Sequence, residues 1–231
     1  MPISRNHTQA FAAYQSLKKK ILSGFFTGSD RLREIEVAAL LEMGRTPVRE
    51  ALKRLEDEGL LTNEPRRGLV VTTLDQQAVS ELYAMREVLE GAAAAFAAKH
   101  ATPAEVANMG AILDEHDESA DPVAMNLAFH GAIYGSAHNR HLIRSLQSVA
   151  DSTYLLGRST LANAQRAQLA KVEHRQILEA ISSGDAVRAA EAAQGHIRNA
   201  LLERLKMLRQ RQSDAATATP QGEGKNHETF H

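Results

Sequence analysis

Apolar residues recur at helical spacing along most of the chain. In the N-terminal third this pattern predicts three helices, over residues 9–23, 34–42 and 46–58. Two short apolar runs follow, at 60–63 and 69–72, on either side of a turn rich in Pro, Gly and Arg, and they predict a β-hairpin. Helix, short turn and helix form a helix-turn-helix. With the hairpin behind it, the pattern predicts a winged helix-turn-helix.

The third predicted helix carries its own start and stop signals. Thr46 is the expected N-cap, Pro47 the expected first helical residue and Gly59 the stop. Its apolar residues form one stripe, and its polar and basic residues lie on the other side. A helix with a buried face and cations near its N-terminus suits a DNA major groove, although a solvated basic face is the plainer alternative. The residues on the outer side are Arg45, Thr46, Arg49 and Lys53.

The rest of the chain shows helical spacing and no strand pattern. Helices are expected over 76–100, 104–116, 123–136, 140–157, 161–184 with a possible break near Asn163, and 186–211. The predicted fold class is therefore mainly α: a winged helix-turn-helix with three helices and a β-hairpin, then an all-α bundle of six or seven helices. The expected domains are 1–73 for DNA binding and 74–211 for effector binding and dimerisation, followed by a polar, disordered tail at 212–231.

Charge and composition support this division into two parts. Residues 1–72 carry 12 Lys and Arg against 9 Asp and Glu, whereas the remainder carries 15 against 19. A basic first third on an acidic remainder is typical of two domains with separate tasks. The 231 residues include no cysteine, which excludes disulfides and thiolate chemistry and fits a cytoplasmic location. No apolar run resembles a signal peptide or approaches the length of a membrane span, so no membrane partner is expected.

Three histidines occupy positions at which the helical pattern of the second domain places apolar residues. They are His130, His174 and His196, and Asn126 lies one turn before His130 on the same face. A single inward histidine is more often a hydrogen-bonded core residue than a ligand. Three imidazoles and an oxygen donor from three helices of one bundle instead suit Zn²⁺ or a similar divalent ion with open coordination positions.

Arg86 shares an apolar stripe with Leu82 and Leu89, so its side chain is expected to point inward. A buried guanidinium needs an anion. Glu90, one helical turn later, is the simplest candidate for this anion. The sharper hypothesis is a small organic acid whose carboxylate is held by the metal at one end and by Arg86 at the other.

Two other readings of the helical domain stay open. One is a metalloenzyme that acts on a small acid; against it, no inward Asp or Glu at a convincing spacing is available as a general base, and the N-terminal domain would be unexplained. The other is a DNA-binding protein whose helical domain only dimerises and whose histidines are structural. We expect a regulator rather than an enzyme.

The N-terminal third resembles the DNA-binding domain of GntR-family bacterial transcription regulators. The resemblance implies that Arg45, Thr46 and Arg49 contact DNA from the recognition helix and that Gly68 contacts it from the wing, beside Arg67. We add Lys53 to the expected DNA contacts because it lies on the outer face of the same helix. We also add Arg33, because the family often has Arg where this chain has Ile35, and Arg33 lies two residues away. Family members also often have Ser or Thr in place of Gly44. The segments that carry the resemblance include Leu17–Ile21, Gly28–Leu32, Glu36–Ala38, Arg45–Leu52, Glu58–Leu60 and Arg67–Gly68.

About residues 76–210 resemble the ligand-binding domain of the FadR subfamily, known as the FCD domain. The segments that match are Arg86 with Leu89-Glu90, Asn126 with Phe129-His130, Glu173-His174, and Gly184-Asp185 followed by His196. The resemblance implies that Asn126 and the three histidines bind a divalent metal, zinc or else nickel or another ion, and that Arg86 holds a carboxylate effector. Asn126 stands where Asp is common. It further implies a homodimeric repressor on a pseudo-palindromic operator.

Overall fold

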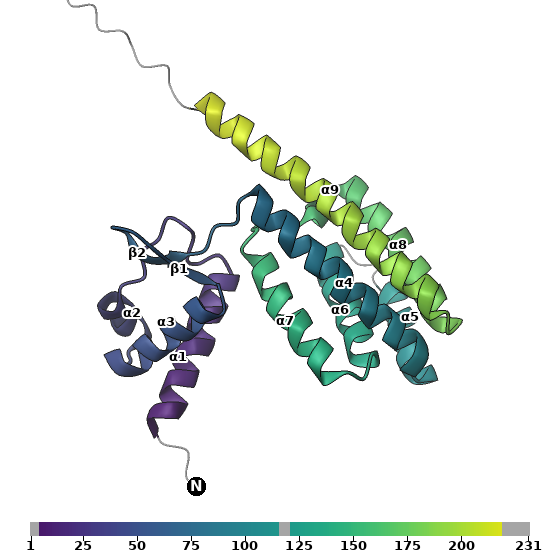
Figure 1. Ribbon diagram of the computed structural model, residues 1–231, viewed down its shortest axis with the longest axis horizontal. Coiled ribbons are helices and arrows are strands. Elements are labelled where there is room, and N and C mark those ends of the chain that lie inside the picture. The colour runs from purple at the N-terminus through teal and green to yellow at the C-terminus, as the bar shows by residue number, and fades with distance from the viewer. Residues whose placement is uncertain (1–4, 116–120, 219–231) are drawn as a thin grey trace, which may run out of the picture.

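The computed structural model describes residues 5–115 and 121–218. Its elements form two parts, a small N-terminal one with a hairpin and a larger helical one, joined after β2 (Figure 1). This is the mainly helical architecture predicted from the sequence. Within the described residues, no helix combines the length and apolar character needed to cross a bilayer.

The N-terminal part contains α1 (Arg5–Leu22), α2 (Glu34–Leu41), α3 (Arg45–Asp57) and an antiparallel hairpin of β1 (Leu61–Glu64) and β2 (Gly68–Val71). In the hairpin Leu61 pairs with Val71 and Glu64 with Gly68. The inner faces of α1, α2 and α3 and residues of the hairpin form one apolar core, which explains why the short α2 is stable despite its length. Its most buried members are Leu17, Val48, Leu55, Leu60 and Leu61.

The start of α3 differs from the prediction. The helix begins at Arg45, and Gly44 is its N-cap in an extended conformation without a side-chain cap. Thr46 is therefore an exposed residue of the first turn rather than the cap. Pro47 is the third helical residue and is buried; its missing N–H still costs no helical hydrogen bond, because the first amides of a helix have no intrahelical acceptor.

Both strands are shifted by one residue from the prediction. Strand β1 begins at Leu61, one residue later, and β2 begins at Gly68, one residue earlier. Arg66 and Gly68 have φ angles of 68° and 77°. This left-handed conformation is natural for Gly68 and unusual for an arginine. The turn therefore projects Arg66 and Arg67 at the tip of the wing.

The helical part contains α4 (Gln76–His100), α5 (Pro103–Glu115), α6 (Pro122–Ser136), α7 (Arg140–Tyr154), a 3₁₀ turn η1 (Thr160–Ala162), α8 (Ala164–Ser182) and α9 (Ala186–Ala218). The predicted break near Asn163 is real, because this side chain caps α8 by accepting from the amides of Gln165 and Arg166. Helix α9 packs along both α4 and α8. Helices α6 and α7 pack against the other side of α4 (Figure 1).

Helix α9 is longer than predicted. It continues through Ala218, so residues 212–218 of the expected disordered tail are helical, and the remaining tail lies outside the described residues.

On α4, Met85 and Val88 are about half exposed, at 51% and 60%. The helical spacing could not show this, because an apolar stripe does not reveal which face the neighbouring helices cover.

Helix α7 is the element of the bundle that meets the DNA-binding part (Figure 1). The Lys18 ammonium lies 2.5 Å from a carboxylate oxygen of Asp151 on α7 and 3.2 Å from one of Glu58, the C-cap of α3. Tyr14 donates its hydroxyl to Glu58, and Leu155 packs against the N-terminal core. A charged junction thus ties the recognition helix to α7.

Candidate functional site

Three histidines from three helices meet in the core of the bundle. His130 on α6, His174 on α8 and His196 on α9 are all buried, and their candidate ligand nitrogens lie within 4.8 Å of one another. The Nε2 atoms of His130 and His196 are 3.3 Å apart. Two nitrogens bound tetrahedrally to zinc at its usual bond length are about 3.3 Å apart. The cluster therefore has a spacing that a zinc ion fits.

Two carboxylates, of the buried Glu90 and the partly buried Glu173, orient two of these rings. Oε2 of Glu90 lies 2.6 Å from Nδ1 of His130, and Oε2 of Glu173 lies 2.7 Å from Nδ1 of His196. An ionised carboxylate only accepts, so each Nδ1 carries the proton and each Nε2 lone pair is free. Carboxylate partners of this kind are the usual support of metal-binding histidines.

His174 has neither ring nitrogen hydrogen-bonded within the described structure, although the residue is fully buried. Its ring lies 4.8 Å from that of Phe129 and 4.7 Å from that of His196. A buried imidazole without a partner loses the hydrogen bonds it would make in water. A metal ion would satisfy one of its nitrogens, so the donor set fits a divalent ion.

Burial favours the neutral form of two of these imidazoles, those of His174 and His196. Burial lowers the pKa of His174, and the neighbouring His196 and His130 lower it further. Burial also lowers the pKa of His196 to about 4, against the opposing effect of its hydrogen bond to Glu173. Neutral imidazoles are the form that binds metals. Burial disfavours ionised Glu90, but His130 and Arg86 outweigh it and hold the pKa of Glu90 below its usual value.

A cavity of about 460 Å³ opens beside the histidines. Asn126, His130 and His196 line it, so Asn126 shares the cavity as its spacing predicts; His174 lies behind them. Arg86 also lines the cavity and donates to Oε1 of Glu90 at 2.8 Å. Glu90, the plain candidate partner, is therefore bound by Arg86 and by His130 together.

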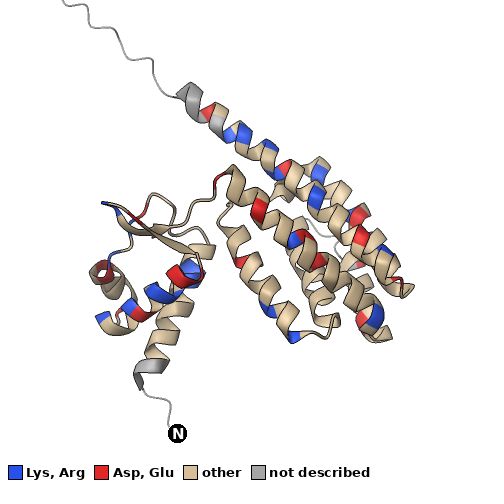
Figure 2. Ribbon diagram, viewed as in Figure 1, with Lys and Arg blue, Asp and Glu red and all other residues tan. Residues whose placement is uncertain are grey.

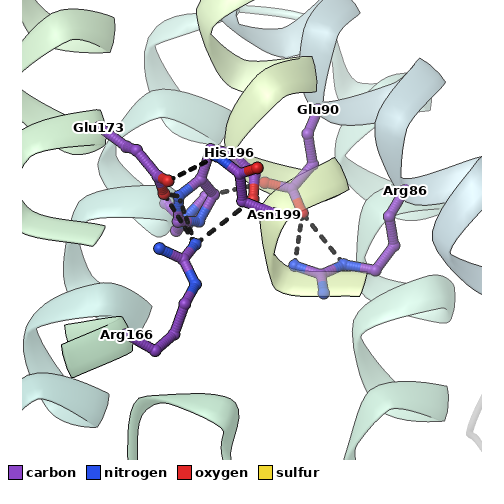
Figure 3. A network of polar contacts seen from close by, with 7 residues as sticks. Arg86, Glu90, Arg166, Glu173, His196 and Asn199 are labelled. Atoms are coloured by element: carbon purple, nitrogen blue, oxygen red, sulfur yellow. Dashed lines mark hydrogen bonds and ion pairs between the residues drawn. The ribbon is translucent and has the colours of Figure 1, made fainter. Parts of the chain in front are cut away.

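Sequence reasoning missed a second polar group next to the triad, which contains two buried arginines, Arg166 and Arg204. Arg166 donates to Oε2 of Glu173 at 2.7 Å, and Asn199 donates to its other oxygen at 2.8 Å (Figure 3). Arg204, also buried, lines the cavity two turns after His196 on α9. Only Glu173 could have been suspected, because it precedes His174; Arg166 and Arg204 look like ordinary surface cations of helices.

The sequence offered no inward Asp or Glu at a convincing spacing as a general base, but two carboxylates do lie beside the histidines. Glu90 and Glu173 are both there, and their helices bring them in from positions 40 and 23 residues away from the histidines they contact. Each is already bound by a histidine and an arginine, however. Both carboxylates therefore serve to position side chains in this structure.

The predicted DNA-binding residues lie on α3, at the start of α2 and on the wing. Arg45 and Arg49 are exposed on α3, and Glu34 of α2 lies 3.7 Å from the first and 2.8 Å from the second. The hydrogen bond from Arg49 lowers the pKa of Glu34. Exposed ion pairs of this kind are weak. Glu34 thus holds the two guanidiniums in place without preventing their transfer to phosphates or bases.

The remaining predicted residues lie at the start of α2, on α3 and on the wing; Figure 2 shows Lys and Arg of this part in blue. Arg67 pairs with Glu64 at 2.7 Å and also donates to the carbonyls of Gly28 and Ser29. Gly68 lies against the side chain of Arg31, which a Cβ at this position would approach at 3.3 Å. Arg33 and Lys53 are exposed and pair with Glu36 and Asp57 on their own helices.

Comparison with known proteins decides the family. Residues 9–71 match the model of bacterial regulatory proteins of the gntR family, and residues 81–199 match the FCD domain. The chain belongs to the gntR family. It is 30% identical over 191 residues to an uncharacterized HTH-type transcriptional regulator, YdhC of Bacillus subtilis (strain 168), covering 80% of this chain and 84% of that protein.

Two further proteins of the family are similar to this chain. A probable D-xylose utilization operon transcriptional repressor of Paenarthrobacter nicotinovorans is 29% identical over 72% of this chain and 75% of its own length. The solved structure of E. coli McbR/YncC superposes with a TM-score of 0.68 over 88% of this chain and 98% of that one, at 22% identity, which shows a common fold. This gntR-family chain is a DNA-binding transcription regulator and not an enzyme.

Proposed function

We propose that this regulator is a repressor whose operator binding is controlled by a small carboxylate effector at a metal site in the helical domain. One observation carries the proposal. Three buried histidines meet in the bundle, and the two that carboxylates orient, His130 and His196, line a cavity that Arg86 also lines. A purely dimerising domain would have no use for a cavity of this size with histidines and arginines in its wall.

In this proposal His130, His174 and His196 hold a divalent metal, with the amide oxygen of Asn126 as a further donor. Zinc suits the three imidazoles best, and nickel or another divalent ion would accept the same donors. The bound ion supplies a Lewis acid for a carboxylate oxygen. Arg86, kept in place by Glu90, holds the same carboxylate by charge-assisted hydrogen bonds.

For DNA we assign the recognition role to Arg45, Thr46 and Arg49, which are exposed at the first turns of α3. Arg67 and Gly68 approach the backbone or minor groove from the wing, and Arg33 and Lys53 contact phosphates. A homodimer would place two such surfaces on a pseudo-palindromic operator. The half-exposed Met85 and Val88 offer apolar area for contact between copies of the chain.

Helix α7 is the proposed connection between the two domains. Residues Val149, Ala150 and Thr153 line the cavity, while Asp151 bonds Lys18 of the DNA-binding part. An effector that displaces α7 therefore changes the support of α1 and α3. Effector and operator must then affect each other's binding reciprocally. We further propose that the effector relieves repression, in keeping with the similar protein that is named a probable repressor. Such a regulator would act in the cytoplasm, where the DNA is.

The metal content of protein purified without an affinity tag tests this proposal. We expect about one zinc or other divalent ion per chain, lost on dialysis against a chelator and restored by added Zn²⁺. Protein that contains no metal and gives no thermal shift with zinc, nickel or manganese would overturn the metal site. It would leave a DNA-binding protein with structural histidines.

A further inference from the structure

The cavity beside the histidines has an excess of buried positive charge. Three guanidiniums line it, those of Arg86, Arg166 and Arg204, whereas Glu90 is the one carboxylate among its described lining residues. Arg166 and Arg204 are each only 4% exposed. Long cationic side chains normally bring their charge to water. Their burial at a cavity wall calls for an explanation in terms of what the cavity binds.

Arg86 and Arg166 have carboxylate partners, but Arg204 has none in the described structure. The Arg86 guanidinium bonds Glu90, and Arg166 bonds Glu173. Arg204 donates through Nη1 to the carbonyl oxygens of Leu156 and Arg158, at 3.3 and 2.9 Å. Carbonyl dipoles satisfy one nitrogen without neutralising the charge. A buried cation without an anion is strongly unfavourable, and a bound metal would add to the excess.

Several donors of these two arginines are also unused. Nε of Arg204 and Nε and Nη1 of Arg166 are buried with no hydrogen-bond partner in the described structure. Buried donors of a guanidinium nearly always have an acceptor. The unused donors and the uncompensated charge therefore indicate the same missing group, an anion with two or more oxygens.

We propose that Arg204 and Arg166 bind a second anionic group, so that the effector is a small organic dianion rather than a monocarboxylate. This inference rests on the proposed function and names the class of its effector. One carboxylate is held by the metal and Arg86; the second group is held at the Arg204 end. The paired N–H donors of a guanidinium fit a carboxylate or a phosphate equally well, because both groups present two oxygens that share a negative charge.

The spacing along α9 suits such a ligand. His196, Ala200 and Arg204 succeed one another at one-turn intervals and all line the cavity. Eight residues of helix rise about 12 Å, and side chains lean toward the helix N-terminus, which brings the Arg204 guanidinium back toward His196. A chain of a few carbons bridges the remaining gap. A cavity of about 460 Å³ falls within the range of small-molecule sites.

Titration calorimetry on the full-length, zinc-loaded protein tests the inference with three probes of similar length: glutarate, 4-phosphonobutanoate and pentanoate. We expect at least one dianion to bind about tenfold or more tightly than pentanoate, because the second group gains charge-assisted hydrogen bonds. Whichever dianion binds more tightly identifies the second group as a carboxylate or a phosphate. Pentanoate binding as tightly as both dianions would overturn the inference.

Variants locate the second group. Arg204→Met should reduce the preference for the dianion to within about twofold, with zinc content unchanged, and Arg204→Lys should keep part of it. The matched control is Arg198→Met, which removes an exposed cation from the same helix and should change nothing. A dianion preference that survives in a folded Arg204→Met protein would overturn the assignment. A wild-type protein that binds no zinc would instead contradict the proposed function, so the two failures are distinguishable.

Discussion

The Lys18 ammonium and the Asp151 carboxylate, 2.5 Å apart, join the DNA-binding part to helix α7. Both side chains are largely shielded from solvent, and Lys18 also lies 3.2 Å from Glu58 at the end of the recognition helix. Proximity to Asp151, Tyr14 and Glu58 outweighs burial and raises the pKa of Lys18. Lys18 therefore keeps its charge at neutral pH, and the ion pair is available to transmit movements of α7.

Replacing Asp151 should weaken communication between effector and operator. Asp151→Asn removes one charge of a partly shielded ion pair, and we expect the effector-induced change in operator affinity to fall by about two- to fivefold. Zinc content should stay the same. Fluorescence anisotropy with labelled operator DNA, with and without effector, measures the change. Asp114→Asn, at an exposed ion pair far from the junction, is the control; equal coupling in both variants would refute a role for α7.

Removing Arg49 should weaken operator binding without affecting the metal site. We expect Arg49→Ala to lower operator affinity by about tenfold or more, because a guanidinium on the exposed face of α3 is lost. The loss should be accompanied by a smaller dependence of binding on salt. Arg188→Ala, at an exposed ion pair in the helical domain, is the matched control. Operator affinity unchanged in Arg49→Ala would show that α3 is not the recognition helix.

Removing His174 should abolish zinc binding. Wild-type protein should unfold at a higher temperature when Zn²⁺ is added, since a ligand that binds only the folded state stabilises it. His174→Ala should lose this shift, because it removes one of three ligands. His138→Ala serves as control, since His138 is an exposed histidine bonded to Glu105 outside the cavity. A zinc-induced shift of equal size in both variants would contradict the triad as a metal site.

Glu58 should make the stability of the protein depend on pH. Burial opposes its ionisation, but hydrogen bonds from Tyr14, Arg54 and Lys18 prevail and lower its pKa below the usual 4.5. A lowered pKa contributes stability above the unfolded value that is lost as the pH falls through the folded one. Glu58→Gln should therefore be less stable than wild type at pH 7, by up to about 1 kcal/mol, since the group is partly exposed.

The difference between wild type and Glu58→Gln should shrink as the pH falls below 4.5 and disappear where the carboxyl is protonated in both the folded and the unfolded state. Urea denaturation at a series of pH values measures it. Glu191→Gln, on an exposed face of α9, should show no such trend. A difference that persists unchanged at low pH would mean that the glutamate acts through its size rather than its charge.

The sequence could predict what local patterns encode. Helical spacing predicted α3 and placed three histidines on inward faces, and two apolar runs around a turn predicted the wing, because each of these features lies within a short stretch of chain. The exact start of α3 escaped it, since Thr46 and Gly44 are both acceptable caps and the packing of Pro47 into the core decided between them.

Contacts between distant residues could not be predicted in the same way. Glu90 meets His130 because α4 packs against α6, and Glu173 meets His196 because α8 packs against α9. Arg204 gave no signal at all, since its burial depends on the turn after α7 folding over it. Long-range packing thus determines which polar side chains surround the predicted ligands.

The dependence of operator binding on both metal and acid tests the central claim most directly. An operator selected from random DNA would be titrated with zinc-loaded and zinc-stripped wild-type protein, each with and without a panel of mono- and dicarboxylates. We expect at least one acid to weaken operator binding by the zinc-loaded protein about fivefold or more, a typical coupling between sites, and to leave the stripped protein unaffected. Equal operator affinity under all conditions, or an equal response without zinc, would contradict the account.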